Sequence, residues 1–316
     1  MFNNSNIDKS IYVDLMDEIK YLNSEYYSLR KSKEYKMGMV LNSTFSSIKN
    51  LNFRQLKKLY SRWFNGVKSE KFAKGERNIE PYAKSDNPNI YFSDKRIAVY
   101  SVVFGKYDEI SEPLCAPDNI DYYFVTDQDV DFSKSKWKKK DISEFESLLK
   151  NMTNAEKNRF FKMHPHLIFP DYEYTIYIDG NIEVISDLTE FVNKMSDIGF
   201  AAHAHNSRDC VYDEAEAVLI AKKESKQALD EHVSYLTMNN MPHHYGLLEC
   251  NVLVRRNCDI VNHIFEEWWN EFNKNCKRDQ LSLPYVLFKE GIAVSSVATL
   301  GKNVFMNSAL RVIVHS

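Results

Sequence analysis

From residue 96 onward, the sequence alternates between short apolar runs and segments with helical periodicity. The apolar runs have the length and composition of buried strands, and they span 96–105, 121–127, 174–178, 198–205 and 247–256. The helical segments span 154–169, 188–195, 260–272 and 279–290. Strands that alternate with helices predict a mostly parallel sheet covered by helices on both faces. We therefore expect an α/β fold with a Rossmann-type mixed sheet.

The N-terminal part of the chain has a different character. We expect a helical extension over 1–78, a linker rich in Pro, Asn and Asp over 79–95, and the α/β domain over 96–316. Within 8–30, apolar residues step by three and four, which fits either a helix packed on its own body or a short coiled coil between two copies. Residues 51–77 hold eight Lys or Arg and two Glu, which fits either a solvated basic face or peripheral contact with an anionic membrane.

Bulk composition excludes several classes of protein. The net charge of −3 gives no case for nucleic-acid binding. No window approaches the roughly 18 apolar residues of a membrane-spanning helix, and the N-terminal residues lack the pattern of a signal peptide. The five cysteines are scattered without CxxC spacing, which is typical of reduced thiols. We expect a cytoplasmic protein.

Polar residues follow three of the predicted strands at the point where each strand ends. Asp179, Gly180 and Asn181 follow the strand 174–178, Thr126 and Asp127 end another, and residues 105–108 (GKYD) follow a third. In open parallel sheets, ligands bind outside the carboxyl ends of the strands. An Asp-Gly pair is also a common turn signal, so a plain turn is the simpler alternative for Asp179.

A metal ion would account for the Asp-Gly-Asn sequence. The chain has neither GxGxxG nor GxxxxGK[ST] among its 9 glycines, so a nucleotide diphosphate would need another partner. A divalent cation held by one or two carboxylates is the usual solution. Asp179 and Asn181 offer oxygen ligands two residues apart, which suits Mn²⁺ or Mg²⁺.

Several stretches together resemble one known family. They are VVFGKYD (102–108), YYFVTD (122–127), 159–181, HNSRDCVYDEA (205–215), 245–256 and 266–286. They resemble the glycosyltransferase-like family first catalogued as a domain of unknown function, found in bacterial surface-polysaccharide loci and in plant proteins linked to pectin and mucilage. The resemblance covers roughly residues 96–295, and YIDGNIEVISDLTEF is similar to the Asp-x-Asp segment of GT-A glycosyltransferases. Asn181 stands where that segment has its second Asp, which removes one charged metal ligand.

The resemblance implies a GT-A-like fold, a nucleotide-sugar donor with UDP favoured, and a glycan or lipid-linked glycan as acceptor. With the strand-end positions, it gives three groups of candidate residues. The metal ligands would be Asp179 and Asn181. Donor or nucleotide binding falls to Phe104, Gly105, Tyr107, Asp108, Thr126, Asp127, Arg159, Lys162, His166 and Gly180. The sugar or acceptor group contains His205, Arg208, Asp209, Tyr212, Glu214, Asn251 and Gln280.

Two carboxylates are candidates for catalysis. Glu249 interrupts a predicted buried strand, where a charge is costly unless it is paired or functional. Asp279 opens a predicted helix next to Gln280, an Asp-Gln pair similar to one near the reacting sugar in glycogenin-like GT-A enzymes. Either residue could act as a general base in an inverting reaction or support the transition state electrostatically in a retaining one. Asp279 could also be a plain helix cap.

Two other functions remain open at this stage. His203 and His205 alternate along a predicted strand, and with His243, His244 and Asp209 they could bind zinc in a hydrolase. Their spacing matches no common zinc signature. A non-catalytic module that binds sugar or nucleotide is the second alternative, but it would not require the Asp279-Gln280 pair in addition to the Asp179 motif.

Overall fold

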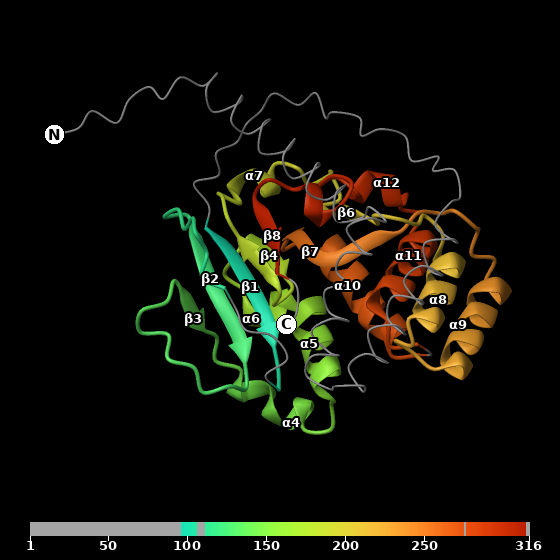
Figure 1. The fold of residues 1–316 in the computed structure, drawn as a ribbon, viewed down its shortest axis with the longest axis horizontal. Coiled ribbons are helices and arrows are strands. Elements are labelled where there is room, and N and C mark those ends of the chain that lie inside the picture. The colour runs from blue at the N-terminus through green and yellow to red at the C-terminus, as the bar shows by residue number, and fades with distance from the viewer. Residues whose placement is uncertain (1–95, 106–110, 275, 314–316) are drawn as a thin grey trace, which may run out of the picture.

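The computed structural model describes residues 96–105, 111–274 and 276–313, which form an α/β unit (Figure 1). The predicted helices within 8–30 and 51–77 and the predicted linker lie outside the described residues. Six strands form the main sheet in the order β3-β2-β1-β4-β7-β6, and two more form a small sheet. The strands of the main sheet are β1 (Ile97–Val103), β2 (Ile120–Thr126), β3 (Trp137–Lys139), β4 (Tyr174–Ile178), β6 (Phe200–Ala204) and β7 (Leu248–Arg256). The small sheet pairs β5 (Ile182–Val184) with β8 (Leu310–Val312).

The main sheet is mixed. Strand β1 pairs in parallel with β2 and β4, and β2 pairs in parallel with β3. Strand β7 runs antiparallel to both of its neighbours, β4 and β6. The expected α/β class is thus confirmed. The carboxyl ends of β1, β2 and β4 lie side by side at one edge of the sheet.

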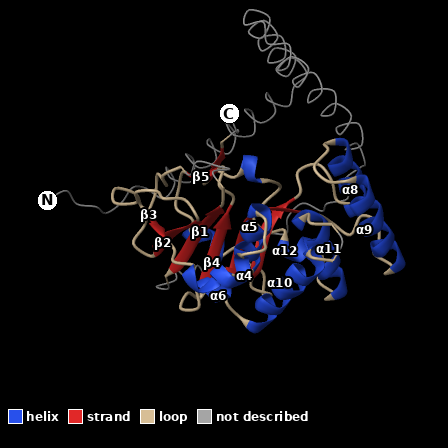
Figure 2. Ribbon diagram, turned by 90° about the horizontal axis from the view of Figure 1, so that it is seen from below, coloured by secondary structure: helices blue, strands red, loops and turns tan. Residues whose placement is uncertain are grey.

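Both faces of the main sheet are buried, which explains the continuous apolar runs in its strands. The long helices lie against one face, where they pack on Tyr100, Tyr177 and Leu253 (Figure 2). The other face, which includes Val99 and Ile176, packs against α7 and the small sheet.

The α-helices are α4 (Glu146–Leu149), α5 (Asn154–Met163), α6 (Pro165–Ile168), α7 (Thr189–Val192), α8 (Val211–Ile220), α9 (Lys226–Met238), α10 (Asp259–Phe272), α11 (Asp279–Lys289) and α12 (Val294–Val297). Two short 3₁₀ helices are η1 (Ser143–Phe145) and η2 (Val304–Met306).

Several helices differ from the sequence-based expectation. The expected helix over 154–169 is two helices, α5 and α6, because His164 precedes Pro165 and a residue before proline avoids the helical conformation. Helix α7 is shorter than the predicted segment 188–195. Helices α8 and α9 were not predicted, and they lie together at the end of the molecule opposite β3 (Figure 1).

Contacts from three directions fix helix α5. A capping box between Thr153 and Glu156 starts the helix. The Asn158 amide donates to the Val102 carbonyl of β1 at 2.5 Å. At the other end, the buried Arg255 guanidinium of β7 donates to the Lys162 carbonyl. These contacts place the side chains of Arg159 and Lys162 beside the strand ends.

In the part of the chain that the structure describes, no helix combines the length and apolar character needed to cross a membrane. The five cysteines are all free thiols.

Candidate functional site

Three neighbouring strands bring polar residues to one edge of the sheet. Gly105 follows β1, Thr126 ends β2, and Asp179 follows β4. The Gly105 amide donates to Asp127 Oδ1 at 3.0 Å, which joins the ends of β1 and β2. Gly105 has a φ of 70°, and a Cβ at this position would meet the end of the Asn154 side chain, so glycine is favoured here. The predicted residues Tyr107 and Asp108 lie outside the described residues.

Asp179 presents a half-exposed carboxylate at this edge. Its side chain is 36% exposed, and its Oδ1 accepts a hydrogen bond from the Tyr177 hydroxyl at 2.7 Å. Its backbone N–H donates to the Asn251 carbonyl of β7 at 2.9 Å. The Oδ1 atom of Asn251 is buried and has no hydrogen-bond partner among the described residues. An accessible carboxylate thus lies beside an unsatisfied amide oxygen, an arrangement that suits a bound ligand.

The Asp-Gly-Asn segment is also a turn. The Ile182 amide donates to the Asp179 carbonyl at 3.0 Å, which closes a four-residue turn between β4 and β5. The Asn181 side-chain amide lies 3.4 Å from the Ile313 carbonyl, and the Ile313 amide donates back to the Asn181 carbonyl at 2.8 Å. The turn therefore coexists with an exposed carboxylate, so the two interpretations of this segment do not exclude each other.

A buried ion-pair cluster lies directly behind Asp179. Lys162 Nζ, on a side chain that is 1% exposed, lies 2.6 Å from Asp279 Oδ2 and 3.9 Å from Asp179 Oδ1. Arg159 Nε is 3.0 Å from the same Asp279 oxygen. The Trp268 indole donates to the Asp279 carbonyl at 3.1 Å and so fixes the start of α11. The structure thus joins residues that the sequence analysis had assigned to separate tasks.

The protonation state of Asp279 follows from this cluster. Burial pushes the pKa of its carboxyl group upward, but the charges of Arg159 and Lys162 outweigh burial and hold the pKa well below its ordinary value. A carboxylate of such low basicity is a poor general base at neutral pH. Asp279 is therefore suited to holding the two cations in place.

Glu249 and Asn251 lie on an irregular part of β7. Ala202 of β6 pairs with Leu253, but the next residue, His203, pairs with Glu249, so β7 contains extra residues at this point. Such bulges redirect side chains beside functional sites. The Glu249 carboxylate accepts from the Val304 amide at 3.1 Å and lies 3.4 Å from Asn251 Nδ2. It thereby ties η2 to the main sheet.

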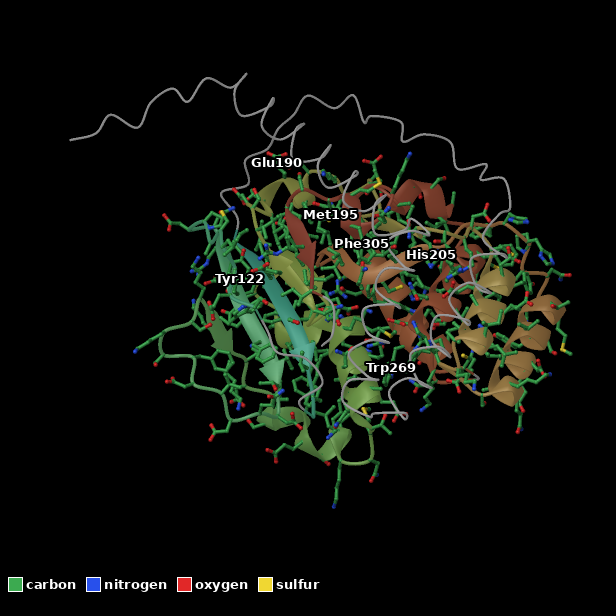
Figure 3. All side chains as sticks on the ribbon, in the orientation of Figure 1. Tyr122, Glu190, Met195, His205, Trp269 and Phe305 are labelled. Carbon is green, nitrogen blue, oxygen red and sulfur yellow. The ribbon has the colours of Figure 1, made fainter. Side chains whose placement is uncertain are left out.

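The histidines of β6 have separate partners. His203 is fully buried, and its Nε2 accepts from Asn307 Nδ2 at 3.0 Å. His205 (Figure 3) follows β6, and its Nδ1 accepts from the Ser207 and Arg208 amides. Its Nε2 lies 3.5 Å from Glu214. The predicted pairing of His203 with His205 in one zinc site gains no support from these contacts.

His203 gives the protein a specific dependence on pH. Burial lowers the pKa of its ring to about 3 in the folded protein, whereas the pKa in the unfolded chain is about 6.5. As the pH falls through about 6.5, the unfolded chain therefore binds a proton that the folded chain does not bind. Between pH 7.5 and 5.5, we expect this residue alone to lower the free energy of unfolding by about 1.4 kcal/mol. Urea unfolding of the wild type and His203→Asn at both pH values measures the difference. The exposed His263→Asn is the control, and an unchanged pH dependence in His203→Asn would contradict the assignment.

The predicted sugar or acceptor residues of segment 205–215 contact one another or the residues at 241–244. The Arg208 guanidinium donates to the Glu214 carboxylate. The Tyr212 hydroxyl donates to the Met241 carbonyl at 2.7 Å, and Asp209 Oδ1 is 2.8 Å from His244 Nδ1. Gln280 is half-buried in the first turn of α11. These contacts give the segment a defined shape at the start of α8.

His166 does not lie at the strand ends. Its Nε2 is 3.3 Å from Glu266 of α10. It lines a small cavity with Thr175, near the start of β4 and therefore at the end of the strand opposite to Asp179. The contacts of α6 with α10 determine this position, which the sequence pattern around Pro165 does not reveal.

A groove at the ends of β1, β2 and β3 contains residues that the sequence analysis missed. Its volume is about 590 Å³, and its walls include Phe104, Thr126 and Asp127. Four lysines also line it: Lys139, Lys140, Lys150 and Lys157. The basic run at 138–140 was a local signal for part of this set, but Lys150 and Lys157 reach the groove only through the packing of α4 and α5.

Comparison with known families places the chain among glycosyltransferase-like proteins. The model of the TOD1/MUCI70 glycosyltransferase-like domain matches residues 71–316, and the chain belongs to that family. The resemblance found in the sequence is thereby confirmed.

Individual relatives are distant. "Probable hexosyltransferase MUCI70" of Arabidopsis thaliana is 24% identical over 213 residues, which cover 60% of this chain and 37% of that protein. The chain therefore spans little more than a third of this relative's length. Among solved structures, apo mouse xyloside xylosyltransferase 1 has 12% identity and a TM-score of 0.38, with 64% of this chain and 83% of that chain covered. The apo WbbM bifunctional glycosyltransferase has 10% identity and a TM-score of 0.39, with 63% and 38% covered.

Proposed function

We propose that this protein transfers a sugar from a nucleotide-sugar donor, with a UDP-sugar favoured, to a hydroxyl group of a glycan or lipid-linked glycan in surface-polysaccharide synthesis. The half-exposed Asp179 carboxylate, at the edge of the sheet where the parallel strands β1, β2 and β4 end, carries the proposal. Membership in the glycosyltransferase-like family supports the class of reaction. We further propose that the reaction takes place in the cytoplasm.

A divalent cation fits the residues around Asp179. The Asp179 carboxylate and the Oδ1 atom of Asn181 are oxygen donors of the kind that Mn²⁺ and Mg²⁺ prefer. The buried Asn251 Oδ1, which has no partner among the described residues, provides a further acceptor nearby. The cation would supply positive charge to the departing diphosphate. The Tyr177 hydroxyl donates to the Asp179 carboxylate and would restrict its orientation in such a site.

The groove suits the nucleotide part of the donor. Phe104 offers an apolar ring, and Thr126 and Asp127 offer hydrogen-bonding groups for base or ribose. The four lysines along its walls exceed its three acids, Asp127, Asp141 and Glu146, and so favour a negatively charged ligand. Lys157 Nζ lies 5.7 Å from the centre of the Phe104 ring, so one charge lies close to the apolar wall.

The ion-pair cluster would position groups rather than move protons. Asp279 holds Arg159 and Lys162, and Arg159 remains 25% exposed at the side of the site. A guanidinium held in this way is preorganised to face developing negative charge on a leaving phosphate. Asp279 and Lys162 thus contribute through the position of Arg159 and Asp179.

Thermal unfolding in the presence of nucleotides tests the proposal. UDP, GDP and CMP are each added with and without Mn²⁺, and UDP with Mn²⁺ is expected to raise the melting temperature the most. A ligand at a hundred times its dissociation constant adds about 2.7 kcal/mol of stability, which corresponds to roughly 5–10 °C for a domain of this size. If none of the three nucleotides raised the melting temperature, the proposed donor class would be contradicted. An equal rise without Mn²⁺ would contradict the metal requirement.

A further inference from the structure

A second group of potential metal ligands lies at the start of α8. Cys210, Asp213 and His244 each offer one ligand atom, and these atoms all lie within 4.8 Å of one another. Cys210 is the residue before α8, and Asp213 lies in the first turn of that helix. His244 belongs to the loop before β7. The Gly246 amide donates to the Asp209 carbonyl at 2.8 Å, which holds the loop against this helix start.

The His244 ring is oriented as metal-binding histidines commonly are. Its Nδ1 is 2.8 Å from the Asp209 carboxylate, which leaves Nε2 as the nitrogen available to a metal. A histidine that binds a metal through one nitrogen usually donates from the other to a carboxylate or carbonyl group. Asp209 therefore acts as the positioning partner in this arrangement. The His244 side chain is 57% exposed, so an ion can reach it from solvent.

A fourth side chain, His243, lies next to one member of this group. His243 Nδ1 lies 3.7 Å from Cys210 Sγ. With Zn–S near 2.3 Å and Zn–N near 2.0–2.1 Å, two ligands of a tetrahedral zinc ion are separated by about 3.5 Å. The Tyr212 ring stacks on His243 at 4.2 Å between centroids and restrains it. Sulfur, one ring nitrogen and a carboxylate oxygen therefore converge from two segments, and a second imidazole lies beside the sulfur.

We propose that Cys210, Asp213 and His244, with the neighbouring His243 as fourth ligand, bind one structural zinc ion that holds the start of α8 against the loop at 243–246. Thiolate and imidazole ligands favour zinc, whereas the all-oxygen set at Asp179 favours Mn²⁺ or Mg²⁺. Four protein ligands make a closed site, which is typical of structural zinc. The ion would fix the first turns of α8, from which Glu214 holds Arg208. The zinc site would therefore stabilise the shape of the 205–215 segment.

Metal analysis of the purified full chain tests this proposal. After treatment with a chelator and one equivalent of Zn²⁺, followed by dialysis, the wild type is expected to retain one zinc ion per chain. Replacement with Co²⁺ is expected to give a thiolate-to-cobalt charge-transfer absorption. Cys210→Ser is expected to abolish this absorption, and the exposed His244→Ala to reduce zinc retention at least tenfold with an unchanged circular dichroism spectrum.

Two matched variants serve as controls. Cys258 precedes α10 just as Cys210 precedes α8, so Cys258→Ser should retain both zinc and the cobalt absorption. The His263 side chain is 57% exposed and lies 3.4 Å from Glu290, so His263→Ala matches His244→Ala without touching the cluster. A wild type that retains no zinc, or an absorption that persists in Cys210→Ser, would overturn the proposal. Neither outcome affects the response to nucleotide and Mn²⁺, which depends on Asp179.

Discussion

Replacement of Asp179 by alanine is expected to lower kcat/KM for sugar transfer by at least about a hundredfold, the scale seen when a preorganised charge-stabilising group is removed. The carboxylate lies at the edge of the sheet where the parallel strands β1, β2 and β4 end, and Tyr177 donates a hydrogen bond to it. Its removal would weaken cation binding and leave the departing diphosphate without that charge. Initial rates with the donor identified by thermal unfolding measure the effect. The Mn²⁺-dependent rise in melting temperature should disappear in the same variant.

Two further variants test whether the negative charge of Asp179 causes the effect. Asp179→Asn keeps an oxygen that can accept from Tyr177 but removes the negative charge, so it should lose most of the metal response with little loss of stability. Asp197→Ala removes an exposed acid before β6, at the opposite edge of the sheet, and should leave the rate unchanged. A rate in Asp179→Ala within about twofold of the wild type would refute the assigned role.

The predicted strands β1, β2, β4, β6 and β7 could be recognised because each is buried almost throughout. Strand β3 was not predicted, since it is three residues long and only its Trp137 is buried. Strand β4 spans the predicted residues 174–178, and β7 begins one residue after the predicted start. Helix α9 was missed although its local signals are present. Ser225 caps its first turn, and Leu229, His232 and Leu236 form a buried stripe at helical spacing. Helix α8 was missed because its first residues were assigned to a binding segment.

The candidate site was predictable in part. The meeting of Gly105, Thr126 and Asp179 follows from a general property of parallel strands. The pairing of Lys162 with Asp279 joins residues 117 positions apart, and no local pattern contains that information. His203 and His205 were expected on one side of a strand, but β6 ends at Ala204, so the alternation on which that expectation rested does not extend to His205.

The Lys162→Met variant is expected to lose about 3–5 kcal/mol of unfolding free energy at pH 7. The Lys162 ammonium is 1% exposed, and without it the buried Asp279 carboxylate keeps Arg159 as its remaining charged partner in the cluster. The pH dependence has a definite sign. Because the folded-state pKa of Asp279 is depressed, its ion pairs add stability above the unfolded pKa of about 3.9. That stability is lost as the pH falls toward the folded-state pKa of Asp279. The difference in unfolding free energy between the wild type and Lys162→Met should therefore shrink below about pH 4.

A double-mutant cycle tests whether the loss of unfolding free energy in Lys162→Met arises because the buried Asp279 carboxylate has lost one of its two cationic partners. Lys162→Met combined with Asp279→Leu removes both charges and should be less destabilised than the sum of the two single variants, since apolar replacement of a buried ion pair is often near neutral. Lys289→Met is the surface control. Lys289 Nζ lies 3.2 Å from Glu267 on partly exposed side chains, and its loss should cost at most about 1 kcal/mol. Additive effects in the cycle would mean that Lys162 stabilises α5 through its own packing, and Asp279 would then lose its assigned role as the group that positions Lys162.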